Sequence, residues 1–206
     1  MEQRVAIVDY GMCNLDSVRR AFEEVGARAY VTDEPAELGR ADRIVLPGVG
    51  AFPNAMRNLR ERGLDDALAK YVIDEAVPFL GVCLGMQLLA QVSHEVATSD
   101  GLGWLDAEVV RLQATAGDTR VPHIGWNEVD ALPGSPLFAG IPPRADFYFV
   151  HSFHMVCRDA ADVCATTPYC GGFTSAVASR NVFAVQFHPE KSQRHGLTLL
   201  RNFLEL

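Results

Sequence analysis

The stretch from Val77 to Leu89 constrains the fold of this chain more than any other part of it. Two apolar runs meet there at Cys83, which lies between Gly81 and Gly85. The G-x-C-x-G spacing is the cysteine counterpart of the G-x-S-x-G elbow, in which a strand turns sharply into a helix. Because both glycines lack a Cβ, the strand and the helix can approach each other closely. The sequence therefore predicts a strand, a tight turn with Cys83 at its apex, and a helix.

A cysteine at such a turn has two interpretations. The N-terminus of a helix stabilises negative charge, so it favours the thiolate, which is the reactive form of cysteine. Free cysteines are also among the most buried residue types, so Cys83 could simply fill space in the core. A nucleophile needs a base and an oxyanion site, and the rest of the chain must supply them.

The first half of the chain alternates between apolar runs and helical patterns. Runs typical of buried strands cover residues 4–10, 29–32, 43–46 and 78–82. Helical periodicity covers residues 15–25, 53–62 and 64–75. Strands that alternate with helices predict an α/β fold with a doubly wound, mostly parallel sheet.

The second half of the chain is rich in short strands instead. Strand-like runs cover residues 107–112, 126–129, 146–153, 163–166, 176–178 and 182–187, and a helix is predicted over residues 193–205. Turn residues such as Pro142-Pro143 and Gly171-Gly172 separate these runs. No repeat, low-complexity tract or linker divides the sequence, so we expect one domain over residues 1–206 with added β-structure in its second half.

His188 is the best candidate for the base. It follows the apolar run 182–187 directly, and active residues of open α/β sheets lie at the carboxyl ends of strands. Glu190, two residues later, can orient the imidazole and stabilise its charged form. Taken alone, a histidine at a strand end is more often a surface residue, and it is the elbow at Cys83 that favours the catalytic interpretation.

The other five histidines have weaker claims. His123, His151 and His154 could line a pocket or an interface, whereas His94 and His195 are predicted to lie on helix surfaces. No H-x-x-x-H or H-E-x-x-H spacing indicates a metal site.

The loop Pro47-Gly48-Val49-Gly50 follows the third predicted strand. Its glycines let the backbone adopt unusual angles and direct N–H groups at a ligand. Glycine turns after strands are common, so the loop has meaning only near a nucleophile. In an elbow the N–H of the residue after the nucleophile, here Leu84, is the usual oxyanion donor. The loop is a candidate for the second oxyanion donor.

Charge and cysteine content narrow the class of protein. The net charge of −8 argues against nucleic acid as the main partner, because phosphate binding needs clustered Lys and Arg. The five cysteines form no C-x-x-C pair, which indicates free thiols in a reducing compartment. The spacings of Cys157, Cys164 and Cys170 fit no common zinc pattern, so neither a metal site nor a cofactor is predicted.

Residues 76–93 carry no charge, which raises the question of a membrane span. Pro78, the two glycines and Gln87 within that run argue against one, and a strand, elbow and helix explain it better. The apolar run near the N-terminus is too short for a signal peptide. We therefore expect a cytoplasmic protein that does not contact a membrane.

Together, these features resemble those of the class I, or triad, glutamine amidotransferases. The motifs that carry the resemblance are Asp9-Tyr10-Gly11 with Asn14-Leu15, Pro47 to Phe52, Gly81 to Gln87, Val121 to Asn127, and Phe187 to Gln193. The P-G-V-G form of the oxyanion loop resembles the branch that serves histidine biosynthesis. The resemblance implies a flavodoxin-like open, mostly parallel sheet flanked by helices, with additional antiparallel β-structure in the second half.

The resemblance also implies roles for particular residues. Cys83 would attack the side-chain amide of L-glutamine, His188 would move the proton, and Glu190 would orient His188. Gly48, Gly50, Gln87, Ser152 and Phe153 match positions that line the glutamine pocket, while the N–H groups of Val49, Gly50 and Leu84 match the oxyanion site. The Val49 peptide of such enzymes flips before its N–H points inward.

The partner that the resemblance implies is a (β/α)8-barrel cyclase, which would form a heterodimer with this chain and receive the ammonia. His123, Trp126, Asn127 and Lys191 match segments that face this partner. The sequence departs from the family pattern at Cys13, where glycine is more common, and at Phe153, where tyrosine is common. His154 follows Phe153, and these departures affect details of the pocket and the interface.

Three alternatives stay open. A paralogue could feed ammonia to a different synthase with the same chemistry. A subunit with a decayed site could act only as a scaffold, although Cys83, His188 and Glu190 are all intact. A general cysteine hydrolase could share the elbow, but it would not explain the His-Pro-Glu segment after the last predicted strand.

Overall fold

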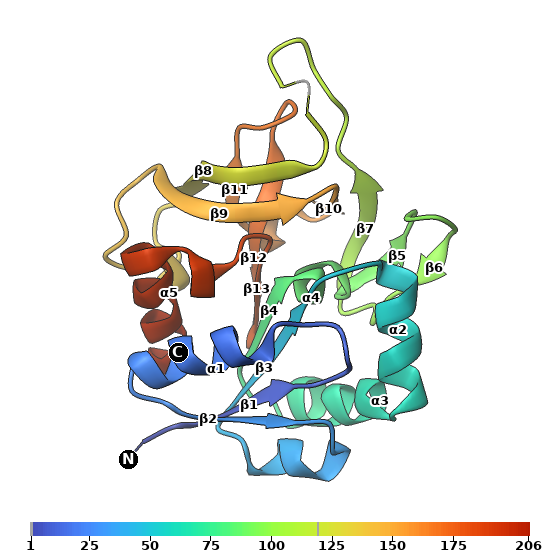
Figure 1. Cartoon of the computed structure of the whole chain (residues 1–206), viewed down its shortest axis with the longest axis vertical. Helices are drawn as coiled ribbons and strands as arrows, with labels where there is room; N and C mark the ends of the chain where they lie inside the picture. Colours follow the sequence, from blue (N-terminus) through green and yellow to red (C-terminus); the bar gives the residue numbers. More distant parts are fainter. Residues whose placement is uncertain (1, 119) are drawn as a thin grey trace.

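A nine-stranded sheet runs through the molecule in the computed structural model, which describes residues 2–118 and 120–206 (Figure 1). The strand order is β2-β1-β3-β4-β13-β12-β11-β8-β9. The first five are parallel: β2 (Arg28–Thr32), β1 (Arg4–Val8), β3 (Arg43–Gly48), β4 (Phe79–Cys83) and β13 (Val182–Val185). The predicted mostly parallel sheet is thus confirmed for the half of the fold that carries the elbow.

Antiparallel strands extend this sheet on the β13 side. They are β12 (Phe173–Ser179), β11 (Val163–Thr167), β8 (His123–Ala131) and β9 (Ala145–His151). A second, four-stranded sheet has the order β10-β7-β5-β6, with β10 (Phe153–Cys157), β7 (Leu105–Arg111), β5 (Ala90–Ser93) and β6 (Ser99–Asp100). The additional antiparallel structure predicted in the second half is therefore present.

Helices cover both faces of the parallel part (Figure 1). Helices α1 (Leu15–Glu24) and α5 (Gln193–Glu205) pack against each other on one face, where the rings of Phe22 and Phe203 meet edge to face at 6.3 Å. Helices α2 (Phe52–Glu61) and α3 (Leu64–Leu68) cover the other. The side chains of β1 alternate between the two hydrophobic cores, as the period of a strand requires.

The remaining helical segments are short. They are α4 (Leu84–Gln87), the π-helical turn η2 (Ala69–Asp74), and the 3₁₀ turns η1 (Pro35–Arg40), η3 (Pro136–Phe138), η4 (Ala160–Asp162) and η5 (Pro189–Lys191). Within residues 2–118 and 120–206, no helix combines the length and the apolar character needed to cross a membrane.

Three predicted elements differ from the observed ones. The helix after the elbow ends at Gln87, and β5 follows it. Periodicity did not predict this change, because a short apolar run can be either a strand or a buried helix. The helix predicted over residues 64–75 continues beyond Leu68 as the π-helical turn. The strand predicted over residues 146–153 is two strands, β9 and β10, which part at Ser152 and belong to different sheets.

The parallel strands bring their carboxyl ends together at one edge of the sheet. Gly48 at the end of β3 is paired with Cys83 at the end of β4, and Val185 at the end of β13 is paired with Val82. Three segments that are far apart in the sequence therefore meet at this edge, and the candidate site residues lie on them.

Candidate active site

Cys83 occupies the sharp turn between β4 and α4 that the sequence predicts. Its backbone φ is 55° and ψ is −108°, a left-handed conformation that is strained for a residue other than glycine. A Cβ at Gly85 would overlap the carbonyl oxygen of Leu46, and one at Gly81 would lie 2.8 Å from the carbonyl oxygen of Gly85. Both glycines are required here because strand and helix touch through backbone atoms.

His188 and Glu190 form a buried pair directly after β13. His188 Nδ1 lies 2.8 Å from Glu190 Oε1, and both side chains are about 5% exposed. The backbone around them is fixed as well, since the N–H of His188 donates to the carbonyl of Tyr148 and the Ser192 hydroxyl donates to the carbonyl of His188. Glu190 thus lies within hydrogen-bond distance of the imidazole, where it can orient the ring.

The charged and polar surroundings of His188 favour the protonated form of its imidazole. Burial alone would lower the pKa of its imidazole, but the neighbouring side chains of Cys83 and Glu190 outweigh burial and raise this pKa to about 10. The second ring nitrogen, Nε2, is buried and has no hydrogen-bond partner within residues 2–118 and 120–206. A buried imidazolium with a free N–H beside Cys83 is what a thiolate nucleophile and a departing amine both need.

Of the predicted oxyanion donors, the N–H of Val49 is bonded elsewhere in the fold. Leu84 begins α4, so its N–H has no partner within the helix, and Leu84 borders the same cavity as Cys83. The N–H of Val49, in contrast, donates to the carbonyl of Met12 at 2.7 Å. The prediction that the Val49 peptide must flip before it can serve as an oxyanion donor is consistent with this bond. Gly50 has a φ of 111° and supplies the left-handed residue that the turn requires.

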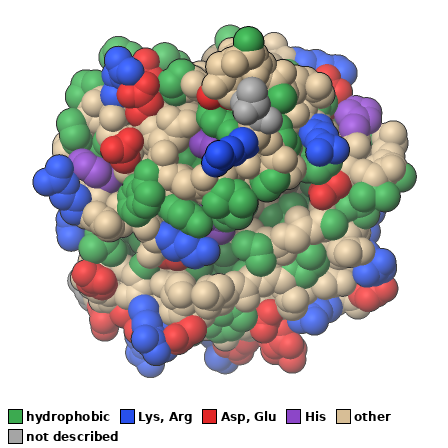
Figure 2. All heavy atoms as spheres, turned by 45° about the horizontal axis from the view of Figure 1, so that its top comes forward, with side chains coloured by type: hydrophobic (Ala, Val, Ile, Leu, Met, Phe, Trp, Pro, Cys, Tyr) green, Lys and Arg blue, Asp and Glu red, His purple; other side chains and the backbone are tan. Residues whose placement is uncertain are grey.

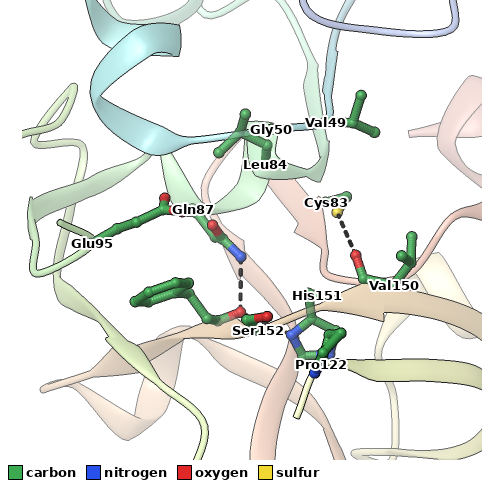
Figure 3. Close-up of a pocket in the computed structure, with 11 residues that line it drawn as sticks. Val49, Gly50, Cys83, Leu84, Gln87, Glu95, Pro122, Val150, His151 and Ser152 are labelled. Carbon is green, nitrogen blue, oxygen red and sulfur yellow. Dashed lines mark hydrogen bonds between the residues drawn. The ribbon is translucent and has the colours of Figure 1, made fainter.

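A cavity of about 300 Å³ opens in front of Cys83 (Figure 3). Val49, Gly50 and Leu84 lie on the side opposite His151 and Ser152, and Gln87 points across the cavity toward the β9–β10 junction. Gln87 Nε2 donates to the carbonyl of Phe153 at 2.9 Å. The structure therefore brings together four of the five predicted pocket residues. The fifth, Gly48, lies behind the cavity lining, where a Cβ would overlap the Tyr10 hydroxyl.

Comparison with known proteins gives the family. Residues 6–206 match the family model described as glutamine amidotransferase class-I. The chain belongs to the class I glutamine amidotransferases. Since the match covers nearly the whole sequence, the cysteine elbow and the His-Pro-Glu segment both lie within the family domain.

Three curated relatives of this class I amidotransferase are named as subunits of imidazole glycerol phosphate synthase. This chain is 44% identical over 202 residues to imidazole glycerol phosphate synthase subunit HisH 1 of Campylobacter jejuni (strain RM1221), with 98% of this chain and 100% of the relative covered. It is 48% identical over 202 residues to subunit HisH of Moorella thermoacetica, with 98% and 94% covered. Subunit HisH of Thermosynechococcus vestitus is also 48% identical, with 98% and 96% covered.

Solved structures share the fold of the amidotransferase at lower identity. The structure of PurLQS from Thermotoga maritima has a TM-score of 0.75 and 19% identity, with 100% of this chain and 99% of that chain covered. A glutamine amidotransferase from the same organism has a TM-score of 0.72 and 19% identity, with 100% and 97% covered. At these identities the comparison shows the fold alone, and it agrees with the predicted fold class.

The four residues predicted to face a partner differ in their exposure. Trp126 on β8 is 48% exposed, Lys191 is exposed, and Asn127 is half-buried. The side chain of His123 is only 3% exposed and points into the fold, which differs from the expectation that it lies on the interface. Figure 2 views the amidotransferase with the top of Figure 1 turned forward and shows hydrophobic side chains gathered across the middle of this face, with Lys and Arg side chains among them.

Two residues near the candidate site of the amidotransferase were not predicted from the sequence. Gln186 is fully buried, and its Nε2 lies 3.7 Å from Cys83 Sγ while its Oε1 accepts from Gln87 Nε2 at 3.0 Å. Glu95 borders the cavity, and its Oε2 accepts from the N–H of Phe52 at the start of α2. Gln186 had a usable signal, because it is the one polar residue in the apolar run 182–187. His94, predicted on a helix, lies in a loop after β5.

Proposed function

We propose that this chain is the glutamine-hydrolysing subunit of an imidazole glycerol phosphate synthase, which acts in histidine biosynthesis. The observation that carries the proposal is the buried His188–Glu190 pair beside Cys83, at the point where β4 and β13 end next to a cavity. The relatives named as this subunit support the choice of pathway, since they align over 98% of the chain. The whole of residues 1–206 would act as one domain.

The geometry favours a thioester mechanism. The Cys83 sulfur attacks the side-chain amide carbon of L-glutamine, and the carbonyl oxygen takes up the negative charge beside the Leu84 N–H. His188 donates its Nε2 proton to the amide nitrogen, the C–N bond breaks and ammonia leaves. Water then attacks the glutamyl thioester with His188 as base, which releases glutamate and restores the cysteine.

The pocket supplies groups that can recognise a primary amide or an amino acid. Both donor bonds of the Gln87 amide nitrogen are taken, by Phe153 O and Gln186 Oε1, so Gln87 Oε1 remains as an acceptor for a substrate N–H. We assign Gly48, Gly50, Ser152 and Phe153 to the same glutamine site on the strength of their motifs. The N–H of Val49 or Gly50 would complete the oxyanion site after the loop rearranges.

The partner in this proposal is a (β/α)8-barrel cyclase subunit that receives the ammonia in a cytoplasmic heterodimer. Exposed side chains on β8 and η5 support a contact surface beside the site, with Trp126, Asn127 and Lys191 on it. His123 would support this surface from beneath, since it is buried. The five free thiols are compatible with a reducing compartment.

The Cys83→Ala variant tests the proposed function. Glutamine hydrolysis by the complex should fall to background, while synthesis with added ammonium should stay at the wild-type rate because the cyclase is untouched. Cys170→Ala, which changes a thiol that does not border the cavity, is the matched control and should hydrolyse glutamine normally. Glutaminase activity that survives Cys83→Ala would reject the nucleophile.

The same assay separates the two pathways. Adding the cyclase and its nucleotide ligand should raise the wild-type glutaminase rate steeply. An active subunit that shows no rise with this partner would favour the paralogue that serves a different synthase.

A further inference from the structure

A chain of side-chain hydrogen bonds runs from β8 to the wall of the cavity. Asn127 Nδ2 lies 3.1 Å from His123 Nε2, and His123 Nδ1 lies 3.2 Å from His151 Nε2. His151 Nδ1 then lies 2.8 Å from the carbonyl oxygen of Phe153. The two histidines occupy directly opposed positions of the β8–β9 ladder, so the backbone register sets their spacing.

The direction of every bond in this chain follows from its two ends. The Phe153 carbonyl can only accept, so His151 carries its proton on Nδ1 and, when neutral, presents a lone pair on Nε2. His123 must then donate from Nδ1 and accept at Nε2, where Asn127 Nδ2 donates. At the far end, Asn127 Oδ1 accepts from the N–H of Glu128 at 2.9 Å, which fixes the amide orientation independently. All four bonds agree only if both imidazoles are neutral.

The surroundings of both rings favour the neutral form. The His123 ring stacks on Tyr169 at 4.0 Å and on Phe149 at 4.8 Å between ring centres. Burial lowers the pKa of His123 to about 4 and that of His151 to about 3. The titratable groups nearby are Asp118 and Tyr169 beside His123, and His154 and His188 beside His151.

The chain of hydrogen bonds ends on the Phe153 carbonyl oxygen, which also bonds to Gln87 in the proposed glutamine pocket. Phe153 O accepts from His151 and from Gln87 Nε2, and Gln87 continues through Gln186 to Cys83 Sγ. His151 is the last residue of β9 and Phe153 the first of β10, so the bond closes across Ser152, where the chain passes between sheets. Figure 3 shows His151 and Ser152 at this wall, facing Gln87.

We propose that His151 and His123 are positioning residues for glutamine hydrolysis, held as neutral Nδ1–H tautomers so that the Phe153 carbonyl stays fixed against Gln87. Neither ring takes part in bond making, and both act through Phe153. The inference rests on the proposed function, because it assigns Gln87 and Phe153 to the glutamine site.

Binding of L-glutamine to variants that cannot hydrolyse it tests the proposal. On a Cys83→Ala background, His151→Phe keeps the ring volume but removes both hydrogen bonds, so the dissociation constant should rise about tenfold. His151→Asn keeps a donor at the distance of Nδ1 from the backbone, so it should bind within about threefold of the parent. Equal affinity of the parent and His151→Phe, or equal losses in both variants, would overturn the proposal.

Two controls keep failures distinguishable. His195→Phe changes a histidine on α5 outside the chain of bonds and should leave glutamine affinity unchanged. If the Cys83→Ala parent itself binds no glutamine and the wild-type complex hydrolyses none, the proposed function has failed rather than the role of the histidines.

Nitrogen NMR of the wild-type protein measures the protonation of each histidine ring nitrogen without any substitution. With ¹⁵N-labelled histidine at pH 7, His123 and His151 should both show a protonated Nδ1 and an unprotonated Nε2. An Nε2–H tautomer or an imidazolium at either position would contradict the chain of bonds, even if His151→Phe fails to fold.

Discussion

At the scale of single residues, the site depends on charges that are held away from water. Glu190 and His188 are both almost fully buried, and a buried ion is tolerated only when a partner compensates its lost hydration. Among the residues that the structure describes, Glu190 Oε2 has no hydrogen-bond partner, so the Glu190 side chain depends on its contact with His188 for its stabilisation. The pair therefore sets the proton affinity of His188 as well as its orientation.

Glu190→Gln isolates the charge from the geometry. The amide oxygen of glutamine can still accept from His188 Nδ1, but the negative charge that helps to raise the pKa of His188 to about 10 is lost. This pKa should fall, so the imidazolium disappears at lower pH and the alkaline limb of the kcat/KM profile moves to lower pH. We also expect a loss of about 100-fold in kcat/KM for glutamine hydrolysis.

A matched surface change controls for the substitution itself. Glu37→Gln removes the carboxylate of an exposed ion pair with Arg40, and its pH profile should match the wild type. An unchanged alkaline limb in Glu190→Gln would show that Glu190 does not govern the proton affinity of His188.

At the scale of elements, the elbow works because β3, β4 and α4 make contact without side chains between them. The close approach of Gly85 to Leu46 ties the helix that follows Cys83 to the strand that precedes the oxyanion loop. Packing of backbone against backbone leaves no room for adjustment, since neither group can change rotamer. The relative position of Cys83 and the loop is thus set by this contact.

Gly85→Ala should therefore be severely destabilising. Its Cβ would overlap the Leu46 carbonyl, so β3 and α4 must move apart, and we expect a loss of roughly 3 kcal/mol in unfolding free energy. Gly117→Ala is the control, because a Cβ there meets no atom of the described residues within 4 Å. Chemical denaturation of both variants measures the difference, and equal stabilities would mean that the contact with Leu46 is not tight in solution.

At the scale of the whole molecule, the two edges of the parallel sheet have different roles. The carboxyl ends carry the site, and exposed apolar side chains lie beside it on β8, where Ile124 is 62% and Trp126 48% exposed. At the amino ends, Ile73 is 46% exposed next to Asn181 and Trp104. Similar exposure at opposite edges provides a direct test of where the partner binds.

Ile124→Asp should weaken the complex with the cyclase, whereas Ile73→Asp should not. A carboxylate placed in an apolar contact must lose its water, so we expect the dissociation constant to rise at least about tenfold. Both positions are exposed, so thermal stability should stay within about 0.5 kcal/mol of the wild type. Titration of labelled cyclase against each variant measures the affinity, and equal affinities would place the interface elsewhere.

Local signals predicted more of this structure than might be expected from one sequence. The elbow, the parallel strands and the position of His188 after β13 all follow from glycine spacing and apolar runs, which report on nearest neighbours. The break at Ser152 and the brevity of α4 were not predictable, because they depend on pairing with β7, which is distant in the sequence. For the same reason His123 could be placed in a motif but not recognised as buried opposite His151.

The hydrogen bond from the Val49 N–H to the Met12 carbonyl has a consequence for how the cell uses its nitrogen. Each oxyanion donor contributes roughly 100- to 1,000-fold to turnover, and a donor bound to another residue contributes nothing. We expect the lone subunit to hydrolyse glutamine slowly, although Cys83, His188 and Glu190, the proposed nucleophile, base and orienting acid, are already close together. We expect nitrogen to be conserved in this way, because the lone subunit would release little ammonia into water when no acceptor molecule is present.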